Sequence, residues 1–451
     1  MHIAKVVNIF VGFCLIATCW ANNNLHTKYK WRVIDFKYET AEKRQQAIES
    51  GAFIQTNVIP VGMDVHENRL FVSFPRLKSG VPASLAVINL DEPAENDAPL
   101  LKPYPSWQSH QTTNPNDVLD IVSPFHIKVD RCNHLWIIDT GIDDMLNATK
   151  MKRVAPARVT VINLRDDNIL QRYELPHTTL DGSIFSNIVV DDNDCDNIFA
   201  YIADAATPPT LTVYSFKEKA SWQVKHNFFH FDPLAGNFSL LGTKFQTNDG
   251  LYGLALTEQK ENGYPDLFFH ALTSRNEFNV STKILRDKNI FENDKLKTEH
   301  YKDFKIIGSR KTNEQAGAAV YDPKEKVIFY TLPNNNEIAC WRTTKNYSVS
   351  NVFTSPVEMV YPISVTIDTN HQLWILSNNM QDFIYAKLDV HKINFYIHMT
   401  SVSEAIKNTP CELNFVEKVF NKFSDNGSNG TKPIAILTLI ASVLVLFKQI
   451  F

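Results

Sequence analysis

The stretches that decide the fold are Asp130-Arg131-Cys132-Asn133-His134-Leu135-Trp136 and Asp368-Thr369-Asn370-His371-Gln372-Leu373-Trp374, two copies of one pattern. In each copy an apolar strand precedes the aspartate, a short polar turn follows it, and a second apolar strand contains the tryptophan. Weaker copies occur around Met63-Asp64-Val65, Val189-Val190-Asp191, Leu254-Ala255-Leu256-Thr257 and Val320-Tyr321-Asp322. The chain therefore contains six similar hairpins.

The spacing of these hairpins favours a repeat architecture. Their turn residues, at positions 64, 130, 191, 257, 322 and 368, leave room for two further strands in each repeat. Radial repetition of four-stranded units leaves only short, protected edges, so the sequence predicts an all-β fold, a six-bladed β-propeller. A two-sheet sandwich or two separate all-β domains would not explain six similarly spaced hairpins. Outside the repeats, residues 39–50 are the clearest helix candidate.

The N-terminus has the features of a secretory signal peptide. Lys5 provides a positive charge, residues 6–17 form a mostly apolar run, and Cys19 and Ala21 fit the small-residue positions of a cleavage site. We therefore expect residues 1–21 to be a signal peptide and residues 22–412 to form the propeller domain. An uncleaved membrane anchor is the alternative, although the apolar run is short for a membrane span.

The C-terminus contains a second targeting candidate, in which a polar linker, residues 413–432, precedes a hydrophobic tail, residues 433–451. The uncharged apolar run of this tail is shorter than the roughly 20 residues of a typical transmembrane helix. Its pattern resembles a GPI-attachment signal, with Ser424 or Asn426 as the attachment residue. A single-span anchor and a soluble protein with an apolar tail are the alternatives. We expect a secreted, extracellular protein or one held on the outer face of the plasma membrane.

Cysteine usage fits export. Two of the six cysteines lie in the leader, and an even remainder favours two disulfides, although spacing alone allows three pairings. Cys132 and Cys195 follow the first strand of consecutive repeats, where their turns are neighbours on one rim of a propeller. We therefore predict the pairs Cys132–Cys195 and Cys340–Cys411. Six N-x-S/T sequons, which suit a glycosylated surface, begin at Asn147, Asn237, Asn279, Asn346, Asn426 and Asn429.

Composition and motifs argue against several functions. The net charge of −4 does not suit a nucleic-acid partner. A zincin-like start at His66-Glu67 lacks its second histidine, and the acidic run at 192–196 lacks the glycine and glutamate of an EF-hand loop. The chain contains no G-x-S-x-G elbow and no P-loop. We predict no metal site and no cofactor.

The predicted propeller places a candidate ligand site at one mouth of its channel, where the innermost strands begin. The residues that open these strands are Ile59-Pro60, Pro124-Phe125, Phe185-Ser186, Leu251-Tyr252, Glu314-Gln315 and Pro362-Ile363. Such an apolar, aromatic ring with few polar groups is typical of a small-molecule site. Aromatic side chains there would stack on a ring or hold an ammonium, Glu314 would pair with its charge, and amides would bind a hydroxyl. The predicted ligand-binding residues are Phe125, Phe185, Tyr252, Glu314, Gln315, Asn336 and Ile363.

These residue types also have structural interpretations. Aromatic residues at strand starts often pack between blades. Trp136 and Trp374 follow the repeat and are expected in the core, and the recurrent aspartates suit tight turns. We expect His126 and His134 to be surface or packing residues.

Longer stretches of the chain resemble the insect yellow and major royal jelly protein family. The resemblance covers about residues 30–412, and it is carried by Trp31–Tyr38, Pro60–Val65, Gly80–Leu85, Pro103–Trp107, Val122–Phe125, Val129–Cys132, Leu135–Ile142, Asp249–Leu256 and Ala339–Trp341. It implies a secreted six-bladed propeller. Members resemble pigmentation factors, storage glycoproteins and salivary binders of biogenic amines, and some have been proposed to convert dopachrome.

Three functional hypotheses follow. The first is a non-enzymatic binder of an amine- or catechol-type small molecule, connected with pigmentation or cuticle. The second is a dopachrome-converting enzyme with Glu314 as its acid or base, because tautomerisation needs such a group at the pocket. The third is a structural or storage glycoprotein with an incidental channel.

Overall fold

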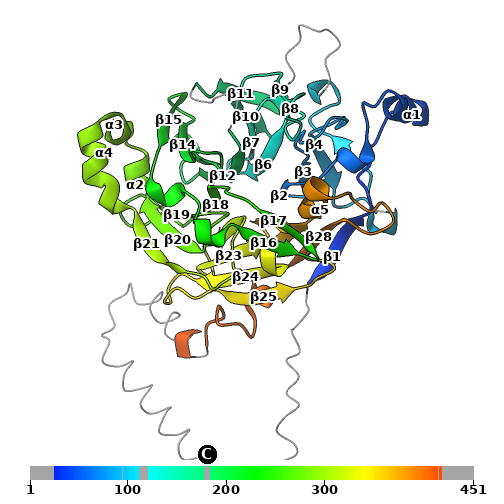
Figure 1. Cartoon of the computed structure of the whole chain (residues 1–451). Coiled ribbons are helices and arrows are strands. Elements are labelled where there is room, and N and C mark those ends of the chain that lie inside the picture. The colour runs from blue at the N-terminus through cyan, green and yellow to red at the C-terminus, as the bar shows by residue number, and fades with distance from the viewer. Residues whose placement is uncertain (1–24, 94, 111–119, 177–182, 415, 419–451) are drawn as a thin grey trace, which may run out of the picture.

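The prediction of a six-bladed β-propeller is confirmed. The computed structural model describes residues 25–93, 95–110, 120–176, 183–414 and 416–418. Within these residues, six four-stranded antiparallel sheets form a ring around the innermost strands (Figure 1). We call the end of the channel where the innermost strands begin the mouth face, and the opposite end, which carries the first hairpin turns, the turn face.

Each of the first three blades is a continuous meander from the innermost to the outermost strand. The strands of blade 1 are β2 (Gly62–His66), β3 (Arg69–Ser73), β4 (Leu85–Asn89) and β5 (Lys102–Pro103). Those of blade 2 are β6 (Pro124–Val129), β7 (His134–Asp139), β10 (Arg158–Asn163) and β11 (Asn168–Glu174). Those of blade 3 are β12 (Phe185–Asp191), β13 (Phe199–Asp204), β14 (Thr210–Ser215) and β15 (Ala220–Val224).

Blades 4 and 5 follow the same order, whereas blade 6 takes its outermost strand from the N-terminus. Blade 4 contains β18 (Leu251–Leu256), β19 (Asp266–Ala271), β20 (Asn276–Ser281) and β21 (Lys305–Ser309). Blade 5 contains β22 (Ala319–Asp322), β23 (Val327–Leu332), β24 (Glu337–Arg342) and β25 (Ser350–Thr354). Blade 6 contains β26 (Pro362–Ile367), β27 (Gln372–Ser377), β28 (Phe395–Ser401) and β1 (His26–Trp31).

The N-terminal strand closes the ring. β1 pairs antiparallel with β28, so that Trp31 lies opposite Phe395 and His26 opposite Met399. Trp31 is almost fully buried, and its indole Nε1 donates to the carbonyl oxygen of Pro99 at 3.0 Å. The first and last strands of the domain therefore share one sheet, which secures the end of the repeat array.

Several short elements lie outside the blades. The predicted helix is present as α1 (Ala41–Glu49), and the Thr40 side chain accepts from Lys43 N at its start. Two hairpins leave the mouth face, β8 (Ile142–Asp143) with β9 (Lys152–Arg153), and β16 (Asn237–Leu240) with β17 (Thr243–Gln246). The remaining helices are α2 (Thr282–Leu285), α3 (Lys288–Glu292), α4 (Asp294–His300), α5 (Met380–Tyr385) and α6 (Val402–Ile406).

The repeated aspartate and tryptophan have a structural role. Asp130 Oδ1 accepts from the backbone N–H groups of Cys132 and His134, both at 2.8 Å, and its Oδ2 accepts from Trp136 Nε1 at 2.8 Å. Asp368 makes the same contacts in blade 6, including one from Trp374 Nε1 at 2.9 Å. The carboxylate thus closes the turn and holds the tryptophan, which explains why the two residue types recur together.

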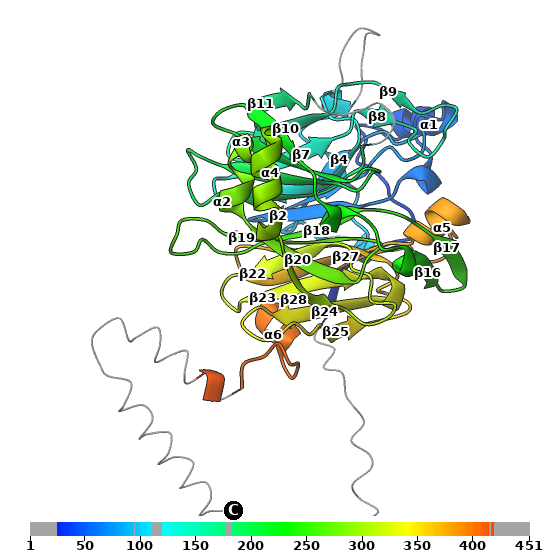
Figure 2. The same cartoon turned by 60° about the vertical axis from the view of Figure 1, so that its left-hand side comes forward.

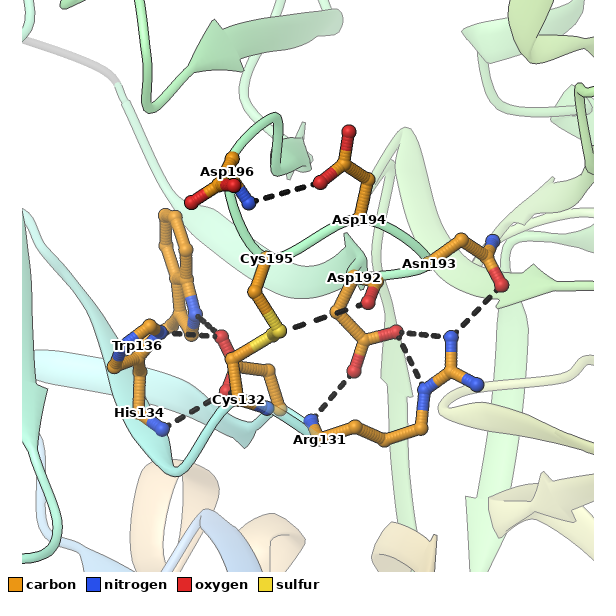
Figure 3. The surroundings of a disulfide bond; sticks show 10 residues. Arg131, Cys132, His134, Trp136, Asp192, Asn193, Asp194, Cys195 and Asp196 are labelled. Atoms are coloured by element: carbon orange, nitrogen blue, oxygen red, sulfur yellow. Dashed lines mark hydrogen bonds and ion pairs between the residues drawn. A yellow bond between two sulfur atoms is a disulfide. The ribbon is translucent and has the colours of Figure 1, made fainter.

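Both predicted disulfides are present. Cys132 and Cys195 join the first turns of blades 2 and 3, and Arg131 binds Asp192 beside them (Figure 3). Cys340 of β24 pairs with Cys411, which follows α6, and so attaches the C-terminal segment to blade 5.

A buried ionic cluster joins blades 4 and 5. Arg310 Nη1 donates to Glu277 Oε2 at 2.6 Å, and His270 Nδ1 lies 3.0 Å from the same oxygen. The other ring nitrogen of His270 lies 2.8 Å from the carbonyl oxygen of Gly317 in the next blade. Gly253 must lack a side chain, because a Cβ there would lie 2.0 Å from His270 Nε2.

The two predicted targeting segments, 1–21 and 433–451, lie outside the described residues, as does most of the linker 413–432. In the part of the chain that the structure describes, no helix has the length and apolar character needed to cross a bilayer.

Candidate functional site

The residues predicted to ring the mouth do open the innermost strands. β6, β12, β18 and β26 begin at the predicted Pro124, Phe185, Leu251 and Pro362. The other two pairs, Ile59-Pro60 and Glu314-Gln315, lie shortly before β2 and β22. The predicted ring therefore lies at one end of the channel.

The aromatic residues of this ring differ in exposure. Phe125 and Ile363 are buried in one apolar cluster at the mouth, whereas Phe185 is 1% exposed in a separate cluster between blades 2 and 3. Tyr252 is half-buried, and its ring meets that of His126 edge-on, with 6.1 Å between centroids. Phe185 is thus part of the packing between blades, and Tyr252 keeps the most exposed surface of these four.

The predicted polar residues lie on the blade 5 side of the mouth. Gln315 Nε2 donates to the carbonyl oxygens of Ala235 and Asn237, at 2.8 and 3.2 Å. Glu314 Oε2 accepts from Lys311 N at 3.0 Å. Asn336 has a left-handed backbone with φ of 52°, and its buried Oδ1 has no hydrogen-bond partner among the described residues. Gln315 therefore holds the chain that leads into β16, and the ligand contacts of these side chains stay predictions.

The hairpin β16–β17, residues 237–246, covers the mouth, and we call it the roof hairpin. Phe238 and Leu240 belong to the same apolar cluster as Phe125, Tyr361 and Ile363. From the blade 3–4 connection the roof hairpin extends to blade 6, where it lies beside α5 in both views (Figures 1 and 2).

Two contacts join the roof hairpin to α5. Phe245 stacks on Tyr385 with 4.6 Å between ring centroids, and Thr243 Oγ1 lies 3.1 Å from Asp382 Oδ1. A molecule that enters the mouth from this face must displace or pass the roof hairpin.

A carboxyl group and three phenols converge beneath the roof hairpin. Burial raises the pKa of Asp249, and a hydrogen bond from Thr247 opposes this effect. Burial and the Asp249 charge together raise the pKa values of Tyr252 and Tyr385. Tyr361 is 8% exposed, and burial, Tyr252 and Asp249 raise its pKa well above its usual value. Asp249 is therefore within electrostatic reach of all three phenols, which is the most distinctive chemistry at the mouth.

His126 lies deeper in the channel, in contact with Tyr252. Burial lowers the pKa of its imidazole to about 4, and the main chain of Ile363 and Ser186 opposes the effect. Neither ring nitrogen has a hydrogen-bond partner within the described residues. At neutral pH the ring is therefore uncharged and able to accept a proton or a hydrogen bond.

The backbone at the mouth is held in an uncommon conformation at Tyr361. Its φ of 46° lies in the left-handed region, which a bulky residue rarely adopts. Asn378 N donates to the Tyr361 carbonyl oxygen at 3.2 Å, and Asn378 Nδ2 donates to that of Pro60 at 2.7 Å. The strain of this conformation, on the order of 1–3 kcal/mol, is a feature that clusters at functional sites.

A second polar group lies further along the channel. Asp64 Oδ2 is 2.8 Å from Lys128 Nζ, and Asp64 Oδ1 accepts from Thr366 Oγ1 at 2.8 Å. These contacts join the innermost strand of blade 1 to those of its two neighbours, blades 2 and 6. In the described ranges, no three His, Cys, Asp or Glu side chains are grouped so that they could hold a metal ion.

Sequence reasoning missed several residues of this site. Asp249, Tyr361 and Tyr385 were not predicted, and His126, which was expected at the surface or in packing, is buried beside Tyr252. Asp249 could have been found from the sequence, because it stands two residues before an innermost strand, β18. His134, by contrast, has a plain structural partner, since its Nδ1 lies 2.9 Å from Asp130 Oδ2.

Most of the chain is similar to proteins of known family. Residues 122–411 match the family model described as "Major royal jelly protein". The "Dopaminechrome tautomerase" of Drosophila melanogaster is 34% identical over 402 residues, which cover 87% of this chain and 85% of that protein. "Protein yellow" of Drosophila yakuba is 35% identical over 406 residues, which cover 88% and 73%.

Among solved structures, the alpha-L-arabinanase of Penicillium chrysogenum is 9% identical, with a TM-score of 0.47 and coverage of 84% of this chain and 99% of that one. The virginiamycin B lyase of Staphylococcus aureus is 12% identical, with a TM-score of 0.38 and coverage of 77% and 96%. The family match and the relatives, which extend over most of the chain, show that it belongs to the yellow and major royal jelly protein family.

Proposed function

We propose that this protein binds a small amine- or catechol-type molecule at the channel mouth beneath the roof hairpin. The observation that carries the proposal is the convergence of Tyr252, Tyr361 and Tyr385 around the Asp249 carboxyl. Aromatic faces and a carboxylate attract an ammonium, and phenols and an imidazole bind ring hydroxyls. The two disulfides support an exported protein, because such bonds persist in oxidising compartments.

Calorimetry on the full-length protein with dopamine, serotonin and octopamine tests this proposal. We expect binding by at least one of them, weakened about tenfold or more by Asp249→Asn, since a buried charge pair is worth at least about 1.4 kcal/mol. Tyr173→Phe on β11 is the matched control, because its hydroxyl bonds Ser221 away from the mouth. Absence of heat for all three ligands would overturn the proposal and favour a structural or storage protein.

Tautomerisation of a catecholamine-derived quinone is a second candidate function, favoured by the acid–base character of the mouth. In this isomerisation a base removes a proton from a ring carbon and an acid protonates a quinone oxygen, so no net oxidation occurs. The neutral His126 is suited to remove the proton, and the Asp249 carboxyl, whose pKa is raised, is suited to supply one. The resemblance to a protein called a dopaminechrome tautomerase supports the same chemistry.

The rate of dopaminechrome loss, compared with the spontaneous rate, tests this second function. We expect Asp249→Asn and His126→Leu each to lower kcat about 100-fold or more, the usual contribution of a general acid or base. Glu314→Gln tests the residue that the sequence favoured, and Asp389→Asn, an exposed carboxylate on the same face, is the control. If the rate equals the spontaneous one while dopamine still binds, the tautomerase function is overturned and the function of a non-enzymatic binder remains.

A further inference from the structure

A hollow of about 420 Å³ lies beside the roof hairpin. Its volume is within the range of about 300–1,000 Å³ that small-molecule pockets occupy. Amide side chains and two phenylalanines dominate its lining, which consists of Asn237, Phe238, Ser239, Lys244, Phe245, Gln246, Asn313 and Asn334. Such a lining supplies both hydrogen-bond donors and hydrogen-bond acceptors, together with an apolar face, and it has no strong net charge.

Asn237 and Ser239, the first and third residues of a sequon, both belong to this lining. Asn237 is exposed at the start of β16, and its Oδ1 accepts from Gln246 Nε2 at 2.7 Å. That bond orients the amide, and among the described residues no hydrogen bond involves its Nδ2. The nitrogen that glycosylation modifies is therefore free, at the wall of a hollow.

Blade 5 supplies the opposite wall. Asn334 Oδ1 accepts from Ser239 N at 2.8 Å, and Asn334 Nδ2 donates to Gln315 Oε1 at 3.2 Å. Asn313 is exposed at the edge of the hollow. A group that fills the hollow would contact both the roof hairpin and the connections of blade 5.

We propose that Asn237 carries an N-linked glycan whose first N-acetylglucosamine occupies this hollow and holds the roof hairpin against blade 5. In the modification, Asn237 Nδ2 bonds to the anomeric carbon of a lipid-linked diphosphate oligosaccharide. The bond from that carbon to the diphosphate oxygen breaks, the lipid diphosphate leaves with the electron pair, and the amide loses a proton. The sugar's acetamide and hydroxyls then bond Asn313, Asn334 and Gln246.

The proposal concerns the stability of the roof hairpin and does not depend on the proposed ligand. Without the sugar, the contacts described above that hold the hairpin on the blade 5 side are the hydrogen bonds of Gln315 and Asn334. With it, opening of the hairpin must also break the sugar's contacts. The glycan would thus slow the motion by which a molecule enters the mouth.

Mass spectrometry and hydrogen exchange on full-length protein secreted by insect cells test the proposal. We expect the Asn237 peptide to carry a glycan, and the amides of residues 237–246 to exchange about fivefold or more faster in Ser239→Ala, because their opening is less costly. Ser239→Ala retains the Asn237 side chain, its bond to Gln246 and the backbone bond to Asn334. Endoglycosidase trimming to a single N-acetylglucosamine should leave the protection unchanged, since the first sugar makes the contacts.

Ser348→Ala is the matched control, because it removes the sequon of Asn346, an exposed residue in the β24–β25 turn on the turn face. We expect that variant to exchange like the wild type at residues 237–246. An unmodified Asn237 would overturn the proposal. So would equal exchange in Ser239→Ala and wild type, or loss of protection after trimming to one sugar. If Ser239→Ala is not secreted, Asn237→Gln also removes the sequon, and it replaces the side chain that accepts from Gln246 as well.

Discussion

At the residue scale, the recurrent aspartate shows how one side chain can specify a hairpin. Asp130 satisfies two turn amides and the indole of Trp136 with two oxygens, and its side chain is fully buried. An aspartate at this position therefore both closes the turn and places the tryptophan in the space between blades.

Asp130→Ala is expected to destabilise the protein by about 2–4 kcal/mol, because it leaves buried donors, including Trp136 Nε1, without an acceptor. Urea unfolding followed by tryptophan fluorescence measures the loss. Asp166→Ala is the control, since Asp166 closes an exposed turn through one bond to Asn168 N, and we expect it to cost under about 1 kcal/mol. Equal losses for the two variants would contradict the assigned role.

His126 makes the folded protein sensitive to acid. Its pKa falls from the ordinary 6.5 to about 4 on folding, so between these values the unfolded chain binds a proton that the folded chain does not. Stability is therefore fully present above about pH 6.5 and decreases as the pH falls toward 4. Replacing the ring with leucine removes this titration, together with the interactions of the ring with the main chain of Ile363 and Ser186.

His126→Leu should shrink the loss of unfolding free energy between pH 7 and pH 5 by on the order of 1–2 kcal/mol. Denaturant unfolding at the two pH values measures it. His391→Gln, at an exposed site, is the histidine variant used for comparison. An unchanged pH dependence in His126→Leu would show that the imidazole is protonated as easily in the folded state as in the unfolded one.

At the scale of single elements, β1 matters more than its six residues indicate. It supplies the outer strand of blade 6, and Thr27 on it lies 3.1 Å from His398, 371 residues away. The roof hairpin is the second such element, because it leaves the blade pattern and contacts blades 5 and 6. Both elements act by contacts that are remote along the chain.

Trp31→Ala is expected to destabilise the domain by about 3–5 kcal/mol, the usual cost of truncating a buried tryptophan. Thermal unfolding and limited proteolysis of the N-terminal segment measure it. Lys30→Ala is the neighbouring control, since Lys30 is only half-buried and makes a surface ion pair with Asp97 worth under about 1 kcal/mol. If Trp31→Ala left both the melting temperature and the protease resistance unchanged, strand β1 would not be needed to close the ring.

At the scale of the whole molecule, the ring is held by contacts between consecutive blades and by two covalent links. The disulfides span 63 and 71 residues, one between blades 2 and 3 and one from blade 5 to the C-terminal segment. The buried cluster of His270, Glu277 and Arg310 performs a similar task between blades 4 and 5.

Removal of the second link with Cys340→Ala/Cys411→Ala should lower the unfolding free energy by about 4 kcal/mol, the chain-entropy value for a loop of this length. Equilibrium unfolding in urea measures the change. Reductant should then destabilise the double variant less than the wild type, because one disulfide remains to be reduced. Unfolding that is equally sensitive to reductant in both proteins would contradict a stabilising role for this bond.

The sequence by itself determined the six hairpins, their turns, the disulfide pairs and the residues that open the innermost strands. These features can be predicted from short stretches of sequence, because strand alternation, the turn aspartate and the buried tryptophan act within a few residues of one another. Gly253 shows the limit of such local reasoning, because the group that excludes a side chain there, the His270 ring, lies in the next strand.

Only the tertiary structure decided that β1 completes blade 6, that the roof hairpin covers the mouth, and that Asp249, Tyr361 and Tyr385 converge beneath it. Each depends on packing between segments far apart in the chain, and no local periodicity records which distant surface a segment will bury. The sequence therefore located the mouth. Which segment covers it, and which acid–base groups meet there, was decided by the packing of the closed ring.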